Sequence, residues 1–152
     1  MNGWYVILNI SVVIVGWVVL YTNAKRIATR AETRIILNNV LEKLNTLRTS
    51  ATEYWLKEPG ELSNGEVVFW TQKTLSELQL IDSSLQLLKR RNMNFDIINL
   101  FVHLRQQVTF GCEYRKKKSQ EPDREKAVKL SESTHSIIEI LEESFLDLYA
   151  PS

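Results

Sequence analysis

The chain has 152 residues, a formal net charge of +1 and one cysteine. This length allows one domain with a real hydrophobic core beside an anchor, and is too short for two such domains. The near-balanced charge favours no partner of either sign. A single cysteine, Cys112, excludes an intrachain disulfide and fits a reducing compartment.

The first element is an apolar run from Trp4 to Thr22 that contains no charged residue. At about 1.5 Å per residue, a helix of this run is roughly 28 Å long, close to the hydrocarbon thickness of a bilayer. Tryptophan and tyrosine stand near both of its ends, where amphipathic rings favour the headgroup level. The sequence therefore predicts a transmembrane anchor over residues 1–22.

A cleaved signal peptide is the competing interpretation, and Thr22, Asn23 and Ala24 offer small residues for cleavage. The apolar run is longer than the usual core of about 7–15 residues, and no positive charge precedes it. All the nearby positive charge follows the run, at Lys25, Arg26, Arg30 and Arg34. We therefore expect a single-pass protein of a cell membrane, specifically a bacterial inner membrane, with its N-terminus outside and its C-terminal domain in the cytoplasm.

Apolar spacing predicts four helices after the anchor. Residues 23–34 form a helical stalk, and the first bundle helix continues unbroken to Lys57 with a heptad seam typical of a bundle or coiled coil. The second helix begins behind Ser63, which pairs with Glu66 as a capping box, and ends at residues 89–92. The seam residues of the first helix are Leu37, Val40, Leu44, Leu47, Ala51 and Tyr54, and the second helix has Leu75, Leu78, Ile81, Leu85 and Leu88.

The third helix is expected from Asn94 to the basic residues 115–118, and the fourth follows Pro122. Their apolar stripes are Ile97, Phe101, Leu104, Val108 and Cys112 in the third, and Ala127, Leu130, Thr134, Ile137, Leu141, Phe145 and Leu148 in the fourth. Short connections predict an all-α fold in which residues 35–152 form an up-down-up-down four-helix bundle. Four leucines should share one core: Leu44, Leu78, Leu104 and Leu141.

No motif predicts catalysis, a cofactor or a metal. Gly60 and Gly65 have the spacing of a phosphate loop, but Glu66 stands where that loop needs lysine. Glu132 and His135 supply one half of a di-iron carboxylate site, and no second half exists in the sequence. We therefore expect no enzyme activity, no cofactor and no metal.

Two sets of residues are candidate contact sites. Asn9, Val13 and Gly16 share one face of the span, where glycine allows close approach and an amide seeks a partner, so we predict self-association there. Alternatively, Asn9 reaches the outer interface. A juxtamembrane basic cluster is expected to bind anionic lipid and comprises Lys25, Arg26, Arg30, Arg34, Lys89, Arg90 and Arg91. These basic runs lack interleaved aromatic residues, so nucleic-acid binding is not expected.

The sequence leaves two functions open. The first is a membrane-anchored helical protein that binds protein at the cytoplasmic face as an adaptor, scaffold or regulator. The second is a membrane effector that self-associates through its span and permeabilises or perturbs the membrane, for example in a bacterial defence or mobile-element system. The expected partners are membrane lipid and either further copies of the chain or another membrane or cytoplasmic protein.

Overall fold

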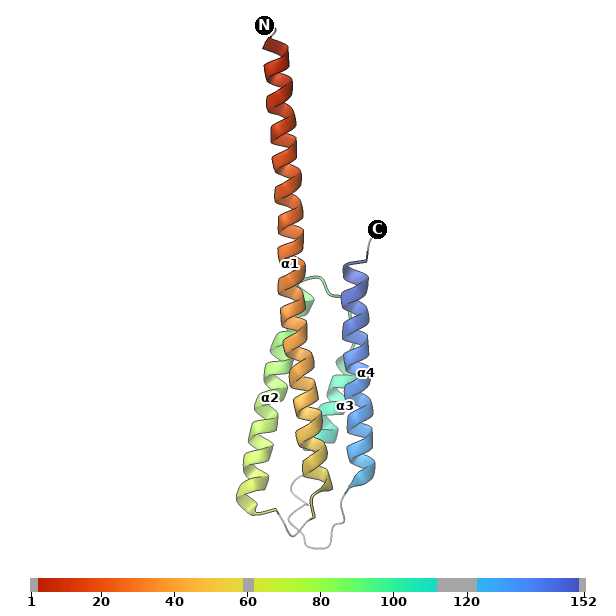
Figure 1. The fold of residues 1–152 in the computed structure, drawn as a ribbon. Coiled ribbons are helices and arrows are strands. Elements are labelled where there is room, and N and C mark those ends of the chain that lie inside the picture. The colour runs from red at the N-terminus through yellow and green to blue at the C-terminus, as the bar shows by residue number, and fades with distance from the viewer. Residues whose placement is uncertain (1–2, 59–61, 112–122, 151–152) are drawn as a thin grey trace. The chain divides into compact units, whose positions relative to one another are not determined.

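A computed structural model describes residues 3–58, 62–111 and 123–150 of the chain. These residues contain four helices and no strand, which confirms the all-α class (Figure 1). The chain divides into two units, Met1–Ile35 and Ile36–Ser152. The four helices are α1 (Gly3–Leu56), α2 (Asn64–Arg90), α3 (Ile98–Thr109) and α4 (Arg124–Leu148).

The unit Met1–Ile35 is helical from Gly3 onward, and α1 continues to Leu56 without a break, as the absence of proline predicts. Every side chain from Leu8 to Glu32 is exposed. Within the described residues, α1 is the helix that is long and apolar enough to cross a membrane, and none of its apolar stretch is buried. This unit therefore has apolar side chains on all sides.

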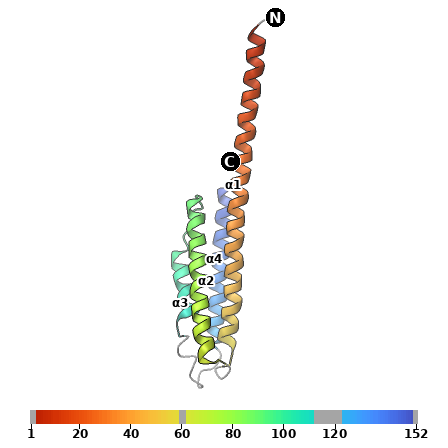
Figure 2. The ribbon, with the colours of Figure 1, turned by 90° about the vertical axis from the view of Figure 1, so that its left-hand side faces the viewer.

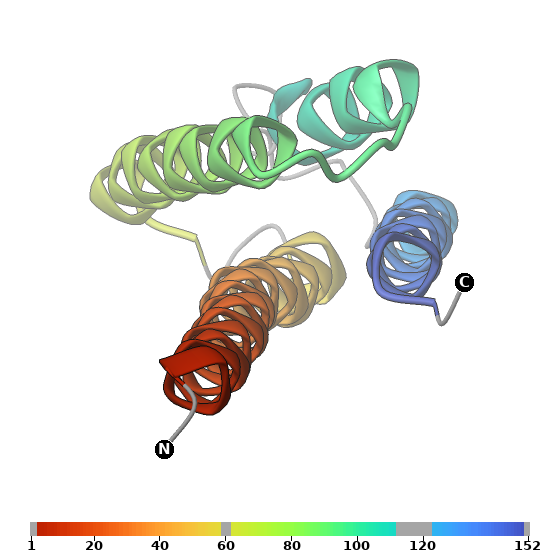
Figure 3. The same ribbon diagram turned by 90° about the horizontal axis from the view of Figure 1, so that it is seen from above.

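The unit Ile36–Ser152 is a helical bundle (Figures 2 and 3). Its buried apolar residues form one core. The seam predicted for α1 is confirmed, because Leu37, Leu44 and Leu47 are all fully buried. The four leucines predicted to share a core belong to one buried cluster. Their exposed fractions are 0% for Leu44, 3% for Leu78, 0% for Leu104 and 0% for Leu141.

Both ends of α2 are fixed by local hydrogen bonds. The predicted capping box is present, with the Ser63 N–H donating to Glu66 Oε2 at 2.7 Å and the Glu66 N–H donating to Ser63 Oγ at 3.2 Å. At the other end Asn92 has a φ of 64°, in the left-handed region. The Met93 N–H then reaches the Leu88 carbonyl at 3.2 Å, the reversal that ends many helices.

The buried face of α2 differs from the prediction at one position. Leu78, Ile81, Leu85 and Leu88 are buried as expected. Leu75 is 37% exposed and Thr74 is 1% exposed, so Thr74 takes the next core position. Continuing the alternating steps of three and four backward from Leu78 leads to residue 74, and residue 75 lies about 100° further round the helix.

The prediction for the third helix was wrong at its start. Residues 93–97 form no helix, and alternate side chains are buried, namely Met93, Phe95 and Ile97. The helix begins only at Ile98 and ends at Thr109, so Ile98 and Val102 remain exposed. Cys112 and the basic residues 115–118, which were expected to complete this helix, lie outside the described residues.

Helix α4 begins after Asp123, whose side chain accepts a hydrogen bond from the Lys126 N–H at 2.9 Å. Asp123, and not a proline in the first turn, is therefore the cap, and Pro122 lies outside the described residues. The predicted stripe is confirmed from Ala127 to Phe145, and Leu148 is half-buried. The Asp123 N–H also donates to the Trp55 carbonyl at 3.0 Å, which joins the start of α4 to the end of α1.

Candidate interaction surfaces

The predicted span contacts lie on one exposed helical face of the unit Met1–Ile35. Asn9, Val13 and Gly16 follow each other at steps of four and three, which keeps them on one side of a helix. A Cβ placed on Gly16 would meet nothing within 4 Å. The helix itself therefore does not require glycine at this position.

The basic residues of this same unit also share a face. Arg26, Arg30 and Arg34 are four residues apart and Lys25 is adjacent to Arg26. Lys25, Arg26 and Arg30 are exposed, and Arg34 is half-buried. Arg30 and Arg34 each have an interaction partner, so part of this charge is already engaged.

The other predicted basic residues end α2, in the unit Ile36–Ser152. Lys89 and Arg90 occupy the last turn and Arg91 is the C-cap, where positive charge is favourable to the helix dipole. Lys89 Nζ also lies 5.3 Å from the centre of the Phe95 ring, a cation–π distance. Arg91 is half-buried and has a partner of its own. These residues consequently stabilise the helix end in addition to any contact with lipid.

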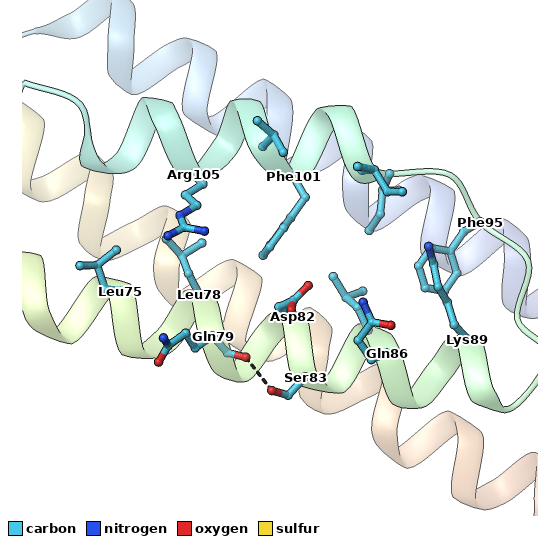
Figure 4. A pocket seen from close by; sticks show the side chains of 14 residues that line it. Leu75, Leu78, Gln79, Asp82, Ser83, Gln86, Lys89, Phe95, Phe101 and Arg105 are labelled. Atoms are coloured by element: carbon cyan, nitrogen blue, oxygen red, sulfur yellow. Dashed lines mark hydrogen bonds between the residues drawn. The ribbon is translucent and has the colours of Figure 1, made fainter.

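A groove of about 690 Å³ lies between α2 and the chain segment from Phe95 to Arg105 (Figure 4). Its exposed apolar residues are Leu75, Ile98 and Val102, with exposed fractions of 37%, 60% and 47%. Residues 93–97 are not helical, and α3, which begins only at Ile98, has the side chains of Ile98 and Val102 outside the core. Sequence analysis missed the groove, although the alternation of apolar and polar residues from Met93 to Ile97 was a usable signal.

Charged side chains of opposite sign border this groove. Figure 4 shows Arg105 extending from α3 toward α2, and Asp82 standing on α2. Among the described residues neither side chain forms an ion pair, and both are exposed. Ser83 is different, because its hydroxyl donates to the Gln79 carbonyl at 2.9 Å. The groove therefore offers an apolar floor with one acidic and one basic group still available to a partner.

An aromatic cluster joins the end of α1 to the start of α2. Tyr54 stacks on Trp70 with ring centres 3.9 Å apart, and meets Trp55 edge-on at 5.3 Å. Lys126 Nζ lies 3.5 Å from the centre of the Trp55 ring and donates a hydrogen bond to the Phe110 carbonyl. The signal in the sequence was a pair of aromatic residues on each side of the break between the two helices, Tyr54 and Trp55 before it and Phe69 and Trp70 after it. The contacts identify the cluster of Tyr54, Trp55 and Trp70 as part of the structural core.

The half-site that resembled a metal site is an ordinary helix face. His135 Nε2 lies 3.2 Å from Glu139 Oε1, and both side chains are well exposed. In the parts of the chain that the structure describes, no three histidine, cysteine or acidic side chains are close enough to hold a metal ion.

Comparisons with protein-family models, curated proteins and solved structures find no match to this chain.

Proposed function

We propose that the protein is a single-pass membrane protein whose helical domain binds protein at the cytoplasmic face, as an adaptor, scaffold or regulator. The observation that carries this proposal is the uniform exposure of apolar side chains along α1 from Leu8 to Leu20. Burying apolar surface contributes about 25 cal/mol per Å², so leaving a whole helix of it in water is unfavourable. A bilayer removes this cost on every face of the helix.

In this proposal residues 4–22 span the membrane, the N-terminus is outside and the domain is in the cytoplasm. The supporting observation is the charge asymmetry, because Lys25, Arg26, Arg30 and Arg34 all follow the span. A green fluorescent reporter fused after Ser152 should be bright, and a phosphatase that is active only outside the membrane should be inactive there. The reverse result would overturn the orientation and favour a cleaved signal sequence.

We assign the domain an up-down-up-down order. One support is the short connection between α1 and α2, which are separated only by residues 57–63. A second is the chain direction in Figure 1, where the colours show that successive helices of the domain run in opposite directions. Such an order leaves the outer faces of the helices free to bind other proteins. The groove between α2 and α3 is one of these surfaces.

The partner that suits this groove is an amphipathic helix. Its apolar side chains would cover Ile98 and Val102, a basic side chain would face Asp82, and an acidic one would face Arg105. This arrangement places opposite charges across the contact, which fixes the register of a bound helix more than it raises affinity. The proposal assigns no catalytic step to the groove.

Two matched substitutions test the groove in the full-length protein. Val102 is 47% exposed inside the groove and Val68 is 50% exposed on α2 outside it. After cross-linking in native membranes, Val102→Glu should lose a co-purifying protein that Val68→Glu retains. If both variants retain every partner, the groove is not the binding surface.

The alternative function, a membrane effector, is favoured by one feature, the polar Asn9 and the small Gly16 inside the apolar run. Expression of the full chain with a membrane-potential dye separates the two functions. An adaptor should leave cells polarised. Prompt depolarisation that requires the span would instead establish the effector.

A further inference from the structure

We infer that the span forms a parallel pair with a second copy of the same chain, along a seam that begins at Asn9 and ends at Asn23. This inference rests on the proposed membrane location. The seam extends the predicted face by two residues, and its members are Asn9, Val13, Gly16, Leu20 and Asn23. Their alternating steps of four and three are the heptad spacing that keeps a seam facing its partner in a left-handed pair.

The polar side chains of the span differ in whether they find hydrogen-bond partners within their own helix. The Thr22 hydroxyl donates to the carbonyls of Val18 and Val19, both at 2.9 Å, so it needs no outside partner. The Asn9 carboxamide is exposed and makes no hydrogen bond to any residue that the structure describes. A carboxamide has two donor hydrogens and an acceptor oxygen, so in hydrocarbon it must find a partner outside its helix.

The depth of Asn9 argues against satisfaction by the outer interface. Asn9 is five residues beyond Trp4, which places it about 7.5 Å below the interfacial aromatic residue. Lysine and arginine reach the interface from such depths through long flexible side chains, and the asparagine side chain is much shorter. The amide must therefore meet a polar group within the membrane.

Gly16 supplies the second observation. Glycine weakens a helix relative to alanine, and a Cβ at this position would meet nothing within 4 Å, so the monomer gains nothing from glycine here. A neighbouring helix would gain, because a missing side chain lets two backbones approach closely. Gly16 lies seven residues from both Asn9 and Asn23, midway along the seam.

The chemistry favours a second copy over an unrelated partner. Copies that share one orientation in a membrane are parallel, so each residue faces its own counterpart at the same depth. An asparagine amide is self-complementary, because each copy can donate to the oxygen of the other.

The experiment uses the full-length protein in vesicles of phosphatidylcholine and phosphatidylglycerol. Copies carry Cys112→Ser and a label at Ser152→Cys, and energy transfer between donor and acceptor copies is measured as the protein-to-lipid ratio varies. Asn9→Leu should weaken association by roughly three- to thirtyfold, Gly16→Leu by at least as much, and Asn9→Gln should retain it. Ser11→Leu and Val18→Leu lie about 200° round the helix from Asn9 and Gly16 and should change nothing.

Two outcomes would overturn the inference. Energy transfer no greater than that of randomly distributed labels would exclude a second copy and point to a different protein as the partner. Equal effects of the seam and control substitutions would exclude this face. Flotation with the vesicles, measured on the same samples, separates these failures from the proposed function, because a chain that does not float is not membrane-bound at all.

Discussion

Helix α1 passes through two regions that use apolar side chains in opposite ways. In the unit Met1–Ile35 they occur on every face and are exposed, as for Leu20 at 68%. In the unit Ile36–Ser152 they recur every three or four residues and are buried, as for Leu44 at 0%. The comparison separates two patterns: a helix that is apolar all round, as the proposed membrane span requires, and a helix that is apolar along one stripe, as a protein core requires.

The strongest test of this comparison is one substitution made in both regions. Leu44→Ala should reduce the free energy of unfolding of the domain by about 2–5 kcal/mol, because it leaves a cavity in a closed core. Leu20→Ala should leave that free energy unchanged. Urea unfolding of the full chain in mild detergent, followed by near-ultraviolet circular dichroism, measures both. Equal losses would show that Leu20 also packs in the domain.

A charge placed on an exposed valine sharpens the contrast. Val13 and Val68 are 57% and 50% exposed, so accessibility alone predicts the same tolerance for both. Val13→Arg should disfavour membrane insertion by about 2.5–3.5 kcal/mol, and Val68→Arg should have no such effect. The fraction of protein that resists alkaline extraction from membranes reports the difference. If Val13→Arg is retained like the wild type, this segment does not cross the bilayer.

The capping box at the start of α2 gives a smaller effect that is confined to the domain. Ser63→Ala removes the acceptor for the Glu66 N–H and should lower the free energy of unfolding by about 1 kcal/mol. Ser76→Ala is the matched control, since its hydroxyl only bonds the Gln72 carbonyl within the helix. A loss at Ser76 as large as that at Ser63 would contradict the assignment of the cap.

The same cap should add a weak pH dependence. The hydrogen bond from the Ser63 backbone N–H, followed by the Ser63 hydroxyl, holds the pKa of Glu66 below its ordinary value. Its contribution to stability is therefore present above the ordinary glutamate pKa and is lost as the pH falls through the lowered one. Unfolding of Glu66→Gln should lack this acidic component. An unchanged acid profile in that variant would assign the pH dependence to other groups.

Periodic patterns in the sequence were sufficient to predict most of the fold. The seams of α1 and α4 were identified residue by residue, because a core that closes over a helix accepts apolar side chains only at steps of three and four. Leu75 was wrongly assigned to the buried face of α2 because it is as apolar as its neighbours. Only its angle around the helix excludes it from the core. Burial in this bundle follows geometry, so Thr74 is buried in its place.

The groove could not be predicted in the same way. The sequence predicts that the third helix begins near Asn94 and includes Phe95 and Ile97, although the spacing of two between Met93, Phe95 and Ile97 is not that of a helix. The left-handed Asn92 reverses the chain after α2, and the non-helical segment that follows buries Met93, Phe95 and Ile97. The position of the groove depends on how this segment packs against α2, and no motif encodes that contact. The contact face at Asn9 and Gly16 also comes from sequence spacing, and it stays a prediction.

In the proposed arrangement, α1 is one continuous helix that passes from lipid into a protein core. Spin labels on single cysteines in Cys112→Ser, placed in turn along residues 8–20 and 36–56 of the full chain in vesicles, test it directly. Labels at 8–20 should be protected from a water-soluble nickel complex, most strongly near Val13. Oxygen should relax labels on every face of this segment except the face of Asn9, Val13, Gly16 and Leu20, which the proposed second copy covers. Labels at 36–56 should be protected from both reagents at the buried seam positions and accessible to the nickel complex at the exposed positions between them. Ready access of the nickel complex to Val13 and Val18 would contradict this arrangement.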